Sequence, residues 1–181
     1  MKYTKNSPVI NKQVMERLQA PLITLMTSGA IGGNFEITYA VLQHIYLLVS
    51  QYATRPGSTT GYNLFQNDYK HFFCKMEEPT YIKDVKIDIL AFIANETNMQ
   101  DIINELSEYV IDVNANLAKK AISCIAHIAI RVPSMVKPIF QSILKFFKFQ
   151  TEYISAQCIT VCAGMRLGYI CSIVTQISEL H

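Results

Sequence analysis

The stretch from Asp68 to Arg131 constrains the fold most, because its apolar residues recur at helical spacing through three successive segments. Only short polar turns separate these segments. No alternation of apolar and polar residues of comparable length predicts a β-strand. The stretch therefore indicates a stack of short helices, and we expect an all-α fold.

The helices predicted at and beyond this stretch follow one another at a regular interval. Those beginning near Pro79, Asn114 and Thr151 are spaced by roughly 35 and 37 residues. This is close to the period at which two-helix repeats stack into a solenoid. The pattern predicts an α-solenoid of HEAT/armadillo-like helix pairs. The expected helices cover residues 12–26, 35–52, 81–95, 98–110, 114–131 (capped by Asn114 or Asn116), 134–149 and 151–180.

The chain has three parts by composition. Residues 1–10 are polar and predict a flexible lead-in, and residues 11–181 predict a partial α-solenoid. Pro21 is expected to kink or divide the first helix. Residues 54–63 contain the Arg-Pro-Gly-Ser sequence typical of a solvated loop, and we expect disorder there.

Composition excludes several classes of protein. Half of the 181 residues are apolar, which is enough for a sizeable core, whereas only 17% are charged, which favours some apolar surface for a partner. A net charge of +2 is too small for a nucleic-acid binder. Five cysteines without paired short spacings, and no apolar leader after Met1, indicate a reducing, cytoplasmic setting. The sequon at residues 95–97 is then incidental.

Four residues raise the question of a metal site. Cys124 and His127 lie three apart on one predicted helix, and Cys158 and Cys162 lie four apart on another. The spacing matches no familiar zinc finger, and buried cysteine behaves as a small hydrophobe on apolar helices. No residue can be named to orient a cysteine–histidine nucleophile. We therefore expect neither metal, nor cofactor, nor enzymatic activity, and a Cys/His metalloprotein remains an alternative.

The glycine cluster at residues 28–34 suggests a phosphate cradle, but it lacks the Gly-Lys-Ser/Thr ending of a P-loop. The interpretation favoured is a turn.

Two features bear on membranes. Residues 159–177 approach the length of a transmembrane helix, and Gly164 and Gly168 have the spacing of packed transmembrane helices. Arg166 and Gln176 are costly in a bilayer, so a buried helix is favoured. A modest basic patch could contact acidic lipid headgroups, but a solvated face is expected. It consists of Lys70, His71, Lys75, Lys83 and Lys86.

Two strings carry a resemblance to a known family. They are Tyr-Lys-His-Phe-Phe-Cys at residues 69–74 and Glu-Pro-Thr-Tyr-Ile-Lys at residues 78–83. Residues 86–89, 103–109 and 119–131 continue the match in order and spacing. The sequence resembles the trunk of a β-adaptin, the large β subunit of heterotetrameric vesicle-coat adaptor complexes, from about Val14 to Gly164. The first string is most similar to the β subunit of the fourth adaptor complex. The signature residues are Phe72, Phe73, Pro79, Tyr81, Asp88, Glu105, Tyr109 and Ala121.

The resemblance implies a non-catalytic scaffold in vesicle-mediated transport and cargo selection. Such a trunk wraps the medium and small subunits and pairs with a second large subunit. It associates peripherally with trans-Golgi or endosomal membranes from the cytoplasm. The sequence departs from the family after Gly164, where a charged helix would be expected, and residues 54–63 look like an insertion. We therefore expect a fragment of a larger trunk.

Four lysines are expected to face partners: Lys83, Lys86, Lys119 and Lys120. Their exposure is inferred from helical periodicity. The alternative is another solenoid carrier, for example of the nuclear-transport kind, which would bind a basic targeting peptide or a small GTPase in place of adaptor subunits.

Overall fold

The computed structural model describes residues 8–53, 64–131, 136–149 and 151–178. Every regular element in these ranges is a helix, so the expected all-α fold is confirmed. The chain divides into two compact units, the first ending at Ile93 and the second beginning at Ala94. A bilayer could not be crossed by any helix within the described ranges, since none combines the required length and apolar character.

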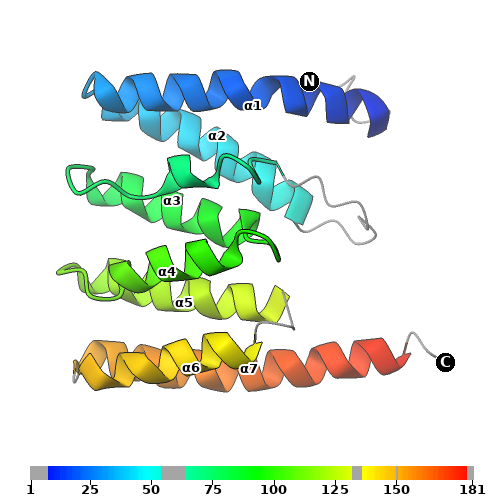
Figure 1. Ribbon diagram of the computed structural model, residues 1–181, viewed down its shortest axis with the longest axis vertical. Helices are drawn as coiled ribbons and strands as arrows, with labels where there is room; N and C mark the ends of the chain where they lie inside the picture. Colours follow the sequence, from blue (N-terminus) through cyan, green and yellow to red (C-terminus); the bar gives the residue numbers. More distant parts are fainter. Residues whose placement is uncertain (1–7, 54–63, 132–135, 150, 179–181) are drawn as a thin grey trace. The chain divides into compact units, whose positions relative to one another are not determined.

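The first unit is built around α2. It contains α1 (Pro8–Ile31), α2 (Phe35–Ala53), the short 3-10 helix η2 (Tyr69–Phe72) and α3 (Thr80–Ile93). Helix α2 packs against both α1 and α3, and η2 packs on α3 (Figure 1). Apolar burial between these helices stabilises the unit. Its fully buried large side chains are Leu42, Ile45, Phe65, Phe72, Ile82, Ile87, Ile89 and Leu90.

Helix α1 differs from its prediction at both ends. It begins at Pro8, inside the lead-in expected over residues 1–10, and it runs to Ile31. Pro21 lies inside the helix without dividing it. Residues 1–7, and the loop predicted over residues 54–63, lie outside the described residues.

The glycine cluster forms the turn between α1 and α2, as predicted. A Cβ atom at Gly29 would lie 2.8 Å from Thr38 Oγ1, so glycine permits the close approach of the two helices. Gly33 has a φ of +70°, and the Asn34 N–H donates to the Gly29 carbonyl at 2.9 Å. This is the left-handed termination common at helix C-termini. Asn34 Oδ1 then accepts from the Ile37 N–H at 3.3 Å and caps α2.

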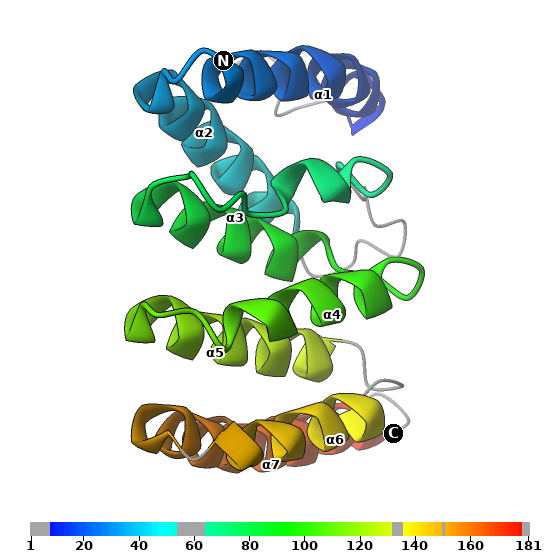
Figure 2. The same ribbon diagram turned by 60° about the vertical axis from the view of Figure 1, so that its left-hand side comes forward.

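The second unit is built around α5. It contains α4 (Met99–Tyr109), α5 (Ala115–Arg131), α6 (Val136–Phe146), the 3-10 helix η4 (Phe147–Phe149) and α7 (Glu152–Ser178). Helix α5 packs against α4 and also against α6 and α7 (Figure 2). Small side chains let these neighbours approach closely. The buried alanines of α5 are Ala118, Ala121, Ala126 and Ala129.

An asparagine precedes both α4 and α5, but only the one before α5 caps its helix. Asn114 Oδ1 accepts from the N–H groups of Asn116 and Leu117, so Asn114 is the cap of α5. Asn98 directly precedes α4, which begins one residue later than predicted, and its side chain does not cap the helix. Its Oδ1 instead accepts from the Asn95 N–H at 2.8 Å. The Nδ2 atom of Asn95 is buried, which is consistent with an incidental sequon.

Replacing Ala121 by leucine should destabilise the second unit. Ala121 is fully buried in α5, and the larger side chain would overpack the contact at a cost of about 1–3 kcal/mol. Thermal unfolding measures the effect, with Ala156→Leu on the exposed side of α7 as the matched control. Equal melting temperatures for the two variants would contradict this placement.

Candidate functional site

Lys86 is not at a partner-facing surface, so the exposure expected for it is wrong. Its side chain is 3% exposed, and its Nζ lies 2.6 Å from Glu78 Oε1. The same ammonium donates to the Phe73 carbonyl at 3.2 Å. Glu78 Oε2 accepts from the Lys75 N–H at 3.0 Å. The ion pair therefore fastens the loop of residues 73–78 onto α3.

Lys86 is buried because this loop covers its side of α3. Helical periodicity alone does not show whether that side of the helix is covered or exposed. Lys86 lies four residues after Ile82 and three before Ile89, both of which are fully buried. A lysine on such an apolar arc, with a glutamate eight residues upstream, is the signal that could have predicted a buried pair.

The aromatic signature residues hold the first unit together. Phe72 is fully buried and meets Phe65 edge-to-face, with ring centres 5.6 Å apart. Phe73, which is half-buried, meets Tyr69 at 5.9 Å. Tyr81 is exposed and meets Tyr39 at 5.4 Å. Such pairs stabilise beyond the area they bury.

The other signature residues also have local structural surroundings. The Pro79 carbonyl accepts from the N–H groups of Ile82 and Lys83 at the start of α3. The Tyr109 hydroxyl donates to the Glu105 carboxylate one helical turn earlier. Asp88 is half-buried in α3, and Ala121 is buried in α5.

A basic surface lies along α5, and we name Lys119, Lys120, His127 and Arg131 the α5 basic face. The two lysines are half-buried, whereas His127 and Arg131 are exposed. Partial burial of the Arg131 side chain lowers its pKa from the ordinary value. Arginine nevertheless stays charged at neutral pH. Helical periodicity predicted the two lysines, whereas His127 was considered only as a metal ligand and Arg131 was not singled out.

Contacts with α7 fix one edge of this face. Lys119 Nζ lies 6.0 Å from the ring centre of Tyr153, which is a cation–π distance. Gln157 Nε2 donates to Ser123 Oγ at 2.8 Å. Ser123 Oγ in turn donates to the Lys119 carbonyl at 3.0 Å. These contacts position the Lys119 side chain on a rigid helix.

The sequence of α5 and α6 is rich in basic residues. Between Val113 and Thr151 it has six lysines and arginines and no aspartate or glutamate. These two helices therefore contribute only positive charge to their surroundings, and a local excess of positive charge attracts acidic groups.

The basic patch of the first unit is smaller than expected. Lys70, His71 and Lys75 are exposed, Lys83 is half-buried, and Lys86 is buried. Lys70 Nζ lies 5.8 Å from the ring centre of Tyr69. The Lys83 carbonyl accepts from the Cys74 thiol at 3.8 Å.

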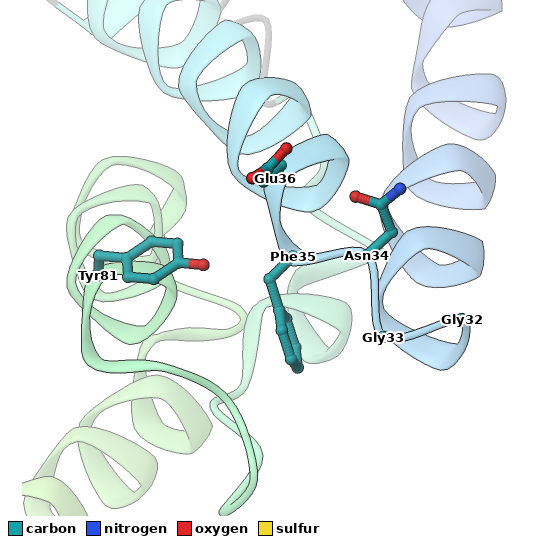
Figure 3. Close-up of a pocket in the computed structure, with 6 residues that line it drawn as sticks. All are labelled: Gly32, Gly33, Asn34, Phe35, Glu36 and Tyr81. Atoms are coloured by element: carbon teal, nitrogen blue, oxygen red, sulfur yellow. The ribbon is translucent and has the colours of Figure 1, made fainter.

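A depression of about 520 Å³ lies at the turn between α1 and α2 (Figure 3). Gly32, Gly33, Asn34, Phe35, Glu36 and Tyr81 line it. Figure 3 shows the Tyr81 ring reaching toward the start of α2, with Phe35 directed away from Glu36. The charged lining residue is a carboxylate, which repels a phosphate. The lining therefore favours a turn over the phosphate cradle that the glycines suggest.

The four candidate metal ligands do not converge. Cys124 and Cys158 are buried, whereas His127 is exposed. Burial, and secondarily the neighbouring Cys162, raises the pKa of the Cys158 thiol to about 11. A thiol with such a pKa stays protonated at neutral pH and is a poor ligand or nucleophile. Within the described ranges, no three histidine, cysteine or acidic side chains are grouped to hold a metal ion.

Comparisons with known proteins agree with the helical architecture. The model of a protein family described as the adaptin N-terminal region matches residues 6–174. The chain is 32% identical over 160 residues to beta-adaptin-like protein A of Arabidopsis thaliana. The aligned residues make up 88% of this chain and 17% of that protein. It is 40% identical over 133 residues to the AP-4 complex subunit beta of Dictyostelium discoideum. Here the aligned residues make up 71% of this chain and 14% of that protein.

A human relative is also matched over most of this chain but only a small part of its own length. The chain is 27% identical over 148 residues to the AP-1 complex subunit beta-1 of Homo sapiens, which covers 82% of this chain and 14% of that protein. The chain therefore spans less than a fifth of the length of these relatives.

Lys86→Met should destabilise the first unit strongly. The substitution leaves the Glu78 carboxylate buried without its partner charge, at a cost of about 3–5 kcal/mol. Urea unfolding measures the loss, and Lys83→Met on the same helix is the control. Adding Glu78→Gln should restore part of the stability, because glutamine removes the unpaired charge and still accepts from the Lys75 N–H. Equal stability of Lys86→Met and Lys83→Met would refute the buried pair.

Thiol labelling should separate the cysteines. Cys158 is fully buried with a raised pKa, so it should resist a maleimide at pH 7.5, whereas the half-buried Cys74 and Cys162 should react faster. Mass spectrometry of peptides after timed labelling measures each rate, with urea-unfolded protein as the control. Native labelling of Cys158 as fast as that of Cys74 would contradict the burial.

Proposed function

The chain belongs to the adaptin N-terminal family, and from this membership we propose that it is a scaffold segment of a β subunit in a vesicle-coat adaptor complex. Members of this family are non-catalytic coat subunits, which agrees with the expectation that the chain is not an enzyme. The proposed role is in vesicle-mediated protein transport and cargo selection. The family match over residues 6–174 is the observation that carries the proposal.

The proposed partners are the medium, small and second large subunits of an adaptor complex. Two of the relatives, the AP-4 complex subunit beta and the AP-1 complex subunit beta-1, are named as β subunits of such complexes, which supports this proposal. The 40% identity to the AP-4 subunit supports assignment to the fourth complex. The proposed location is the cytoplasmic side of trans-Golgi or endosomal membranes, with peripheral association through the complex.

The proposed contact surface in the second unit is the α5 basic face. Packing of the α5 alanines holds this helix firmly, and Tyr153 restrains Lys119. A partner that brings carboxylates to Lys119 and Lys120 would gain charge-assisted hydrogen bonds and faster association. Lys83 remains a proposed contact of the first unit, and it is half-buried rather than fully exposed.

The nuclear-transport alternative needs a surface of opposite charge. A basic targeting peptide would be repelled by the α5 basic face. Helix α4 offers exposed carboxylates at Asp101 and Glu108, while Glu105 is already bonded to Tyr109. The family match favours the adaptor assignment over this alternative.

Charge reversal on α5 should weaken assembly. The chain would be co-expressed with the medium, small and second large subunits of the fourth adaptor complex, and examined by size-exclusion chromatography with light scattering. We expect co-elution for the unmodified chain and at least about tenfold weaker binding for Lys119→Glu with Lys120→Glu. Lys70→Glu with Lys75→Glu is the charge-matched control in the first unit.

Two results would count against the proposal. A monomer that binds none of the subunits would contradict the adaptor assignment. Equal loss of binding in both double variants would show that net charge, rather than the α5 basic face, determines assembly.

A further inference from the structure

The depression at the turn between α1 and α2 brings a carboxylate and an aromatic ring to one cavity. Glu36 is exposed in the first turn of α2, and Tyr81 in the first turn of α3 is 47% exposed. Both side chains line the depression, and a Cβ atom at Gly33 would meet nothing within 4 Å, so the space over this glycine is open. Figure 3 shows the Tyr81 hydroxyl directed toward the start of α2, where Glu36 and Asn34 lie.

The depression lies at an edge of the helix stack, where turns join the helices. Its lining comes from residues 32–34 and from the first turns of α2 and α3. Successive helix pairs of a solenoid stack through the faces of their helices, whereas the turns remain at the edges. A further helix pair would therefore stack beside this depression without covering it.

The charge of Glu36 is not neutralised by α1 or α2. Between Arg17 and Arg55, Glu36 is the only aspartate, glutamate, lysine or arginine in the sequence. Among the described residues, Glu36 has no ion-pair partner. On α3, the half-buried Lys83 is followed directly by Asp84, so the charges next to Tyr81 are of opposite sign.

Three elements favour a cation in the depression. The Glu36 carboxylate attracts a cation directly, and the face of the Tyr81 ring attracts one through its quadrupole. The C-terminal end of α1 carries partial negative charge, and its last turn has no basic side chain to offset it. The partial positive charge at the start of α2 opposes a cation, but Asn34 caps that helix and Glu36 lies in its first turn.

Helix stability alone explains only part of this arrangement. A glutamate in the first turn stabilises a helix, but this effect does not involve an exposed tyrosine of another helix. Tyr39 meets Tyr81 edge-to-face, with ring centres 5.4 Å apart, and holds the ring in place while leaving it exposed. A fixed ring beside a carboxylate suits a guanidinium group, which stacks on aromatic faces and donates paired hydrogen bonds to carboxylates.

We propose that this depression binds a single arginine side chain of another polypeptide. The guanidinium group stacks on Tyr81 and donates to the Glu36 carboxylate. One carboxylate matches one guanidinium, so the site recognises an isolated arginine and not a run of basic residues. The proposal does not rest on the adaptor assignment, because it uses only the geometry and charges of the first unit.

The isotope-labelled 181-residue chain would be titrated with the peptide acetyl-glycyl-arginyl-glycinamide, and its amide chemical shifts would be followed by NMR. We expect saturable shifts at Gly33, Asn34 and Glu36, with a Kd of about 1–10 mM for one side chain. A citrulline peptide has the same shape without the charge and should bind at least about fivefold more weakly. A lysine peptide should also bind more weakly, because an ammonium lacks the planar fork of arginine.

Substitutions should localise the binding. Glu36→Gln and Tyr81→Leu should each weaken binding of the arginine peptide at least about fivefold, whereas Tyr81→Phe keeps the ring and should bind within about twofold of the unmodified chain. Glu77→Gln is the matched control, because it removes an exposed carboxylate that does not line the depression. Thermal unfolding shows whether each variant folds, and Glu36→Gln tests the site even where Tyr81→Leu does not fold.

Several results would overturn the proposal. These are no amide shifts at about 50 mM arginine peptide, equal binding of the citrulline or lysine peptide, or equal binding by Glu36→Gln and Glu77→Gln. A loss for Tyr81→Phe as large as that for Tyr81→Leu would contradict stacking on the ring. The titration contains no adaptor subunit, so its failure would leave the adaptor assignment standing.

Discussion

Each helix pair of this chain carries more apolar surface than it can bury within the pair, and the fold depends on neighbouring helices to cover the remainder. In the second unit, α5 shows this directly, since α4 covers one side of it and α6 and α7 cover another. Ala118, Ala121 and Ile122 are fully buried as a result. Ile159 on α7 is 62% exposed, so apolar burial differs between the helices of this unit.

Helical periodicity predicted the helices well because their apolar stripes are long. Helix α2 was expected over residues 35–52 and covers Phe35–Ala53, and α5 ends at Arg131 as expected. The stripe reports which side of a helix is apolar. It does not report which loop covers that side, and this is why the exposure of Lys86 was predicted wrongly. The Lys86–Glu78 pair forms only once the loop of residues 73–78 has folded over α3.

Most aromatic and proline residues of the family strings are not the residues proposed to contact partners, although Tyr81 lines the proposed arginine site and Lys83 ends the second string. Phe72, Pro79 and Tyr81 pack or begin elements in the first unit. Phe72 contacts Phe65, and Tyr81 of α3 contacts Tyr39 of α2, so these residues contribute to packing within the first unit. The α5 basic face instead depends on charge placed on a helix that other residues fix, so sequence strings locate the scaffold more reliably than its contacts.

Charge in the second unit is segregated in a way that stability alone does not require. Asp101 and Glu108 are exposed on α4, whereas the next carboxylate after Asp112 is Glu152, beyond α5 and α6. Interspersing the two signs would allow local ion pairs, each of small value at an exposed site. Separating them along the sequence places an excess of one sign of charge on each of these helices. Such helices steer an oppositely charged partner and disfavour a copy of the same surface. The charge pattern is therefore better explained by binding to another polypeptide than by folding.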